Sequence, residues 1–154
     1  MLREIGMSII IFFGLPLGVA LGGICRDEVI AGKRWLLLLK RALYLLLVGV
    51  TLFYHRVPWQ IATILIVGGV GYLLLNYRGV YAVLGLAFGI LAAEQNPGLI
   101  HATTIMFLFG LPAGSLMASM RKDSKLPQML LSAAKYVGGM FFPFAFLPLL
   151  VAYL

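Results

Sequence analysis

The sequence predicts an all-α integral membrane protein with about six transmembrane helices, and three observations lead to this fold class. Hydrophobic residues make up 62% of the 154 residues and charged residues only 11%, a composition unlike that of a soluble domain. The apolar residues form long unbroken runs, such as residues 98–120, without the alternation of barrel strands. The charged residues lie mostly between these runs. Because the bilayer core offers no water to backbone groups, such runs favour spanning helices.

Six apolar segments account for the chain, and we expect each of them to cross the membrane. They cover residues 5–24, 33–54, 57–76, 79–93, 98–120 and 126–154. The fourth segment has about 15 residues, fewer than the roughly 20 that a spanning helix needs, so a re-entrant segment is the alternative there. The connections are short, and we therefore expect residues 1–154 to form a single transmembrane domain.

The basic residues predict the orientation of the chain. They are concentrated in the connections after the first, third and fifth segments. By the positive-inside rule, these connections are cytoplasmic and both termini lie outside the cell membrane. The net charge of +7 therefore indicates topology and contacts with anionic lipid, and it does not predict nucleic-acid binding. The candidate lipid contacts are Arg26, Lys33, Arg34, Lys122 and Lys125. Salt bridges to the neighbouring acidic residues are the role that we favour for these side chains, and binding of a lipid headgroup is the alternative.

The most specific pattern is an internal repeat. Residues 13–18, FGLPLG, match residues 109–114, FGLPAG, at five of six positions. At the same offset, Arg26 and Asp27 align with Lys122 and Asp123. An even number of crossings separates the two copies, which predicts a parallel duplication of a helical hairpin, at about residues 5–54 and 98–154, around a central hairpin at about 57–93. One residue out of this register, Lys40 aligns with Lys135.

Each repeated element places proline and glycine near the middle of an apolar segment. Proline removes a backbone hydrogen bond and bends the helix, while glycine allows a neighbouring helix to approach closely. Paired elements of this kind can mark a central transport site. Helix packing is the commoner use of both residues. The transport candidates from this motif are Gly14, Pro16, Gly18, Gly110, Pro112 and Gly114.

Polar residues gather around the connection between the fourth and fifth segments. Glu94, Asn96 and His101 lie there, and His101 falls about one turn inside the fifth segment. Together they are candidates for proton or cation exchange. The alternative, which we favour, is an ordinary interfacial turn in which Asn96 and Pro97 begin the helix.

No pattern in the sequence predicts an enzyme. Cys25 is the single cysteine and the chain has two histidines, so neither a metal site nor a catalytic constellation can be assembled, and no cofactor is expected. We therefore expect a small transporter or channel for an ion or small solute. The alternatives are a non-catalytic accessory or scaffold subunit bound to a membrane-protein partner, and a lipid-binding protein. Stripes of small residues on the first and fifth segments also predict a homo-oligomer.

Overall fold

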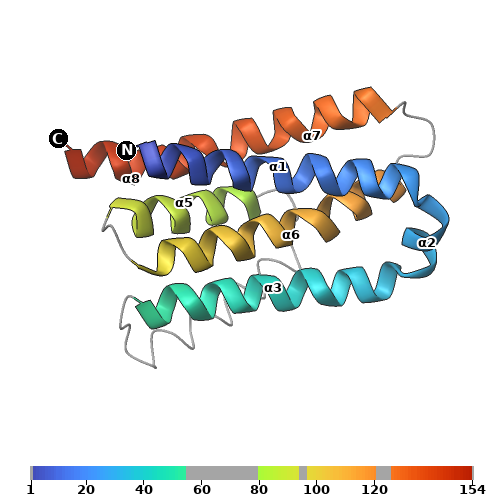
Figure 1. Ribbon diagram of the computed structural model, residues 1–154, viewed down its shortest axis with the longest axis horizontal. Coiled ribbons are helices and arrows are strands. Elements are labelled where there is room, and N and C mark those ends of the chain that lie inside the picture. Colours follow the sequence, from blue (N-terminus) through green and yellow to red (C-terminus); the bar gives the residue numbers. More distant parts are fainter. Residues whose placement is uncertain (1, 55–79, 94–96, 121–125, 154) are drawn as a thin grey trace.

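In the computed structural model, every secondary-structure element of the described residues is an α-helix. The structure describes residues 2–54, 80–93, 97–120 and 126–153. The helices are α1 (Leu2–Ile24), α2 (Arg26–Ala31), α3 (Lys33–Tyr54), α5 (Val80–Ala93), α6 (Gly98–Met120), α7 (Leu126–Met140) and α8 (Phe142–Tyr153). The predicted segment at 57–76 lies outside the described residues. Helix α1 begins and helix α8 ends at the same end of an elongated bundle (Figure 1).

Four described stretches are helical, long enough and apolar enough to cross a membrane. They are Arg3–Ile24, Lys33–Tyr54, Gly98–Met120 and Leu126–Phe146. Three of them agree with the predicted first, second and fifth segments to within a few residues. Their length and apolar composition are compatible with a membrane protein.

Helices α1 and α6 form the centre of the bundle. Each has 23 residues, and their contact is the most extensive between two helices. Gly14 meets Phe107, Gly18 meets Gly110 and Leu111, and Gly22 meets Ser115. Since residue numbers rise together along both partners, the two helices run parallel, as Figure 1 also shows.

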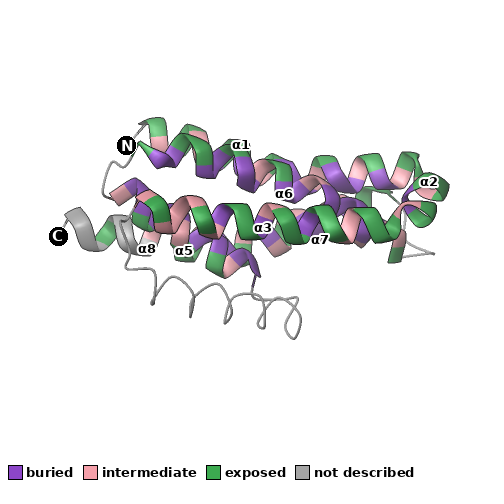
Figure 2. Cartoon of the chain, turned by 90° about the horizontal axis from the view of Figure 1, so that it is seen from below, coloured by how far each residue is buried: buried purple, intermediate pink, exposed green. Residues whose placement is uncertain are grey.

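The second helix of each predicted hairpin packs on the first helix of the other. Helix α3 contacts α6, and α7 contacts α1. On α3 the buried residues are Lys40, Tyr44 and Leu47, at the three- and four-residue spacing of a single helix face. The other side of the helix is exposed, and Figure 2 shows these alternating faces along the bundle. In the part of the chain that the structure describes, helices α3 and α7 therefore each pack on the first helix of the other predicted hairpin and not on that of their own.

The fourth predicted segment is short in the structure, as expected, and the sixth is divided. Helix α5 has 14 residues, so it is about 21 Å long against a hydrocarbon thickness of about 30 Å. The sixth segment is divided at Phe141 into α7 and α8. Pro143 has no N–H to bond the carbonyl of Gly139, and its ring crowds the preceding turn, which explains the break. Hydrogen bonds from Phe141 N to Val137 O, 2.7 Å, and from Ala145 N to Phe141 O, 2.9 Å, bridge it.

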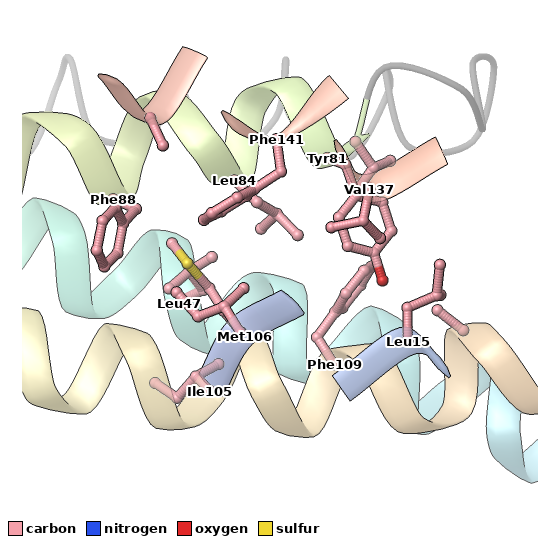
Figure 3. Close-up of a cluster of buried hydrophobic side chains, with 14 of the residues drawn as sticks. Leu15, Leu47, Tyr81, Leu84, Phe88, Ile105, Met106, Phe109, Val137 and Phe141 are labelled. Atoms are coloured by element: carbon pink, nitrogen blue, oxygen red, sulfur yellow. The ribbon is translucent and has the colours of Figure 1, made fainter. Parts of the chain in front are cut away.

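The interior of the bundle is filled by large apolar side chains from most of the helices. Leu84 and Phe88 of α5 pack among residues of α6, α3 and the α7–α8 segment (Figure 3). Phe88 and Phe141 have ring centroids 5.8 Å apart. Helix α5 makes its most extensive contact with α8, and Gly85 lies directly against the backbone of Phe141 and Ala145.

Candidate functional site

The two copies of the repeated element lie against each other, backbone to backbone. A Cβ added at Gly110 would lie 2.5 Å from the carbonyl carbon of Gly14, and one at Gly114 would lie 2.6 Å from the Val19 nitrogen. Such distances leave no room for even one methyl group. The Ser115 hydroxyl donates a hydrogen bond of 2.9 Å to the Gly18 carbonyl oxygen across this contact. We call this contact, formed by Gly14, Gly18, Gly22, Gly110 and Gly114, the glycine seam.

The geometry of the glycine seam fits helix packing, which is the alternative to a transport site for the repeated element. Pro112 is buried and Pro16 is half-buried. The glycines on either side of each proline lie against the backbone of the opposite helix. No water path can pass between α1 and α6 at these residues. The homo-oligomer was predicted from small-residue faces on the first and fifth segments. In the structure these faces contact each other within one chain, so they no longer argue for an oligomer.

Tyr81 marks the point where α5 begins, deep in the bundle. It lies in the first turn of α5 and is 4% exposed. Its ring centroid is 6.0 Å from that of Phe109 and 5.6 Å from that of Tyr136. Phe109 is the central residue of α6, so α5 begins at the middle of the bundle and extends toward one end only (Figure 1). In Figure 3 the Tyr81 side chain points from α5 toward Phe109.

The junction between α7 and α8 lies next to α5. Gly138 and Gly139 precede the break, and a Cβ added at either of them would meet nothing within 4 Å. These two glycines are therefore not required for close packing, in contrast to those of the glycine seam. Because α7 packs on α1 and α8 packs on α5, the junction separates two parts of one chain segment that have different partners.

Lys40 is a buried residue whose environment sequence reasoning missed. Lys40 lies inside the first turns of the second predicted segment, where we expect a long basic side chain to reach back to the headgroups. In the structure it is instead 2% exposed and faces α6. Its spacing from Tyr44 and Leu47 could have indicated the buried face. Lys135 is exposed, so the alignment of Lys40 with Lys135 does not pair equivalent environments. Fewer residues separate α6 from α7 than separate α1 from α3. The residues of α7 are therefore shifted along the helix relative to their counterparts in α3.

The polar cluster at the other end of the bundle is only partly described. Glu94 and Asn96 lie outside the described residues. His101 is exposed and stacks on Tyr54 of α3, with ring centroids 5.9 Å apart and an angle of 26° between the rings. Tyr54 also covers Gly98. His101 thus joins α3 to the start of α6.

The basic candidates are near the opposite end, around α2. Arg26 is half-buried at the start of α2, while Lys33 and Arg34 are exposed in the first turn of α3. Lys122 and Lys125 lie outside the described residues. Cys25 is exposed next to Arg26. A hydrogen bond to Glu28 and the negative charge of that carboxylate raise the pKa of the Cys25 thiol.

Within the described residues, no group of three or more His, Cys, Asp or Glu side chains could hold a metal ion. Comparison of the chain with protein-family models, curated proteins and solved structures finds no match. The function must therefore be argued from the geometry of this chain.

Proposed function

We propose that this protein is a small transporter or channel for an ion or small solute, with no catalytic role. The observation that carries the proposal is the short helix α5. It is too short to span the hydrocarbon core, and it begins beside Phe109, the middle of α6. Helices interrupted at the middle of the membrane are a recurring feature of transporters, where they place backbone groups and side chains in a central site. Tyr81 places a polar side chain at that position, beside Tyr136.

The proposal includes a parallel duplication of a helical hairpin, and the spacing of α1 and α6 supports it. Helices α1 and α6 begin 96 residues apart and end 96 residues apart, which is also the offset of the repeated element. Helix α3 packs on α6, and α7 packs on α1. Related halves around a central site are common in transporters. We infer six spanning or re-entrant segments, including residues 57–76, and both termini outside the cell membrane.

The movable part of the proposed transporter is the pair formed by α5 and α8. This pair packs closely at Gly85, and the packing of α5 against α8 is more extensive than its packing against α6. The open glycines at the α7–α8 junction give the chain a place to bend. The glycine seam, in contrast, is fixed by backbone contacts. Movement of α5 and α8 against the seam would open the buried surface around Tyr81 to water.

Cysteine labelling in a Cys25→Ser background tests the proposal. Single cysteines replace Val80, Tyr81 and Leu84, all buried in this structure, and membranes are treated with a water-soluble thiol reagent from each side. We expect labelling at one or more of these positions, because a transport path must be hydrated in some state. Leu15, buried at 2% exposure within the α1–α6 contact, serves as the matched control and should stay protected. Protection at all four positions, with no ion or solute flux in liposomes, would refute transport.

The second candidate is an accessory or scaffold subunit, and the closed glycine seam favours it. A bundle held by direct backbone contact needs no hydrated interior, and α3 leaves one whole face exposed. A membrane-protein partner, or a second copy of this chain, could cover that face. This candidate predicts protection of all four cysteines together with co-purification of a defined partner or a stable oligomer.

A further inference from the structure

The exposed face of α3 carries two arginines in an arrangement that suits a phospholipid. Arg34, Leu38, Arg41 and Leu45 follow one another at intervals of four, three and four residues, so they share one side of the helix. All four are exposed, with Leu38 at 61% and Leu45 at 41%. We call this surface the arginine face of α3.

The position of Arg41 along α3 favours a negatively charged group near its side chain. It lies eight residues after Lys33, the first residue of α3, and is therefore about 12 Å along the helix axis from the helix start. Apolar residues surround it on the outer side of a helix that is long and apolar enough to span a membrane. A guanidinium at such a position is costly unless its side chain reaches the headgroup layer and meets a negative group there.

The acidic residues of the described chain are on helices other than α3. Glu4 is in the first turn of α1, at the far end of the bundle, while Asp27 and Glu28 are on α2. Arg34 lies two turns, or about 10 Å, nearer than Arg41 to the start of α3. The Arg41 side chain extends toward the headgroups, so both guanidinium groups can approach one phosphate. Arginine suits this role because its planar group binds phosphate oxygens in a bidentate manner.

We propose that the arginine face of α3 binds one anionic phospholipid, with Arg34 and Arg41 on the headgroup phosphate and Leu38 and Leu45 along an acyl chain. Lys33 and the 76% exposed Trp35 flank the headgroup end. The exposed leucines commit the site to a lipid, because a soluble phosphate would gain nothing from them. The proposal does not depend on transport, since it needs only that α3 spans the membrane.

Lipid binding by the purified full chain in detergent tests the proposal. Native mass spectrometry gives the apparent affinity for phosphatidylglycerol and for phosphatidylcholine. The double variant Arg34→Gln/Arg41→Gln should bind phosphatidylglycerol about 25-fold more weakly, since each basic residue near an anionic surface contributes about a factor of five. Its affinity for phosphatidylcholine should change much less.

The matched control is Arg3→Gln/Lys135→Gln, which removes two positive charges from exposed positions on α1 and α7. It should keep the affinity for phosphatidylglycerol. Equal weakening in both double variants would overturn the proposal, because only net charge would then matter. Competition by glycerol 3-phosphate as effective as that by the lipid would overturn it in favour of a soluble anion.

A single conservative variant keeps the test decisive if the double variant does not fold. Arg41→Lys retains the charge but loses the bidentate geometry. We expect a loss of phosphatidylglycerol affinity smaller than the roughly fivefold loss for Arg41→Gln, with the elution volume and helical content of the parent protein. Unchanged affinity in Arg41→Lys and in Arg41→Gln would remove Arg41 from the site.

Discussion

Two groups of glycines in this protein do opposite things. Those of the glycine seam are closed by the backbone of the facing helix, and a Cβ at Gly18 would come within 2.7 Å of the Gly110 carbonyl oxygen. Those before the α7–α8 junction, Gly138 and Gly139, have no neighbour within 4 Å of an added Cβ. The same residue type therefore permits close contact in one region and local bending in the other.

The difference shows that a glycine-rich membrane sequence is not uniformly flexible. In the glycine seam, replacing glycine would force apart two helices that meet along most of their length. At the junction, replacing glycine would only reduce the conformational freedom of the backbone. Substitution by alanine at each place separates the two roles, because alanine adds one methyl group and favours helix.

The largest effect is expected for Gly18→Ala. The added methyl group would collide with carbonyl groups of α6, which cannot move aside as a side chain can, so we expect the free energy of unfolding to fall by about 3 kcal/mol. Denaturant titration in detergent, followed by circular dichroism, measures it. The control is Gly49→Ala on α3, where nothing lies within 4 Å of the added Cβ. Equal stability of the two variants would show that the glycine seam is not closed.

A smaller effect is expected for Ser115→Ala. This change removes the hydrogen bond to the Gly18 carbonyl oxygen and leaves the shape of the glycine seam almost unchanged. Hydrogen bonds between membrane helices contribute about 1 kcal/mol, so the same titration should show a loss of that size. Ser132→Ala is the control, since its hydroxyl bonds the Gln128 carbonyl within its own helix. A larger loss in Ser132→Ala would contradict the assignment.

The smallest change in stability, and the most informative for function, is expected for Gly138→Ala/Gly139→Ala. There is space for both methyl groups, and alanine favours a helix more than glycine does, so no packing contact is lost. We expect stability to be kept or slightly raised. If the chain transports as we propose, flux in liposomes should fall several-fold, because the junction stiffens. Gly49→Ala, with the same open environment, should keep its flux. Undiminished flux in the junction variant would show that α8 does not move during transport.

Sequence reasoning predicted much of the fold because spanning helices have strong local signals. The bounds of α3 and α6 follow from the length of the apolar runs and from the charges and turn residues beside them. The fourth segment was recognised as short for the same reason. The division of the last segment was not predicted, although Gly138, Gly139 and Pro143 were visible, because proline and glycine also occur within continuous membrane helices.

The candidate site was predicted less well. The sequence singled out the repeated element as important, but residue types alone did not decide between a transport path and a packing contact. We expected the Lys40 side chain to reach the lipid headgroups, but it is buried because α6 packs over it. Tyr81 carried no local signal, because its place at the middle of the bundle depends on where α5 packs.

The sequence by itself determined that the chain is helical and suited to a membrane, which helices are long, and that two of them share an element. These properties follow from local composition, since the lipid environment requires every spanning segment to pair its own backbone groups. Only the tertiary structure decided that the shared elements close against each other, that α3 packs on α6 and α7 on α1, and that α5 begins at the centre. Those features depend on which faces meet, and close contact between distant residues has no counterpart in local sequence.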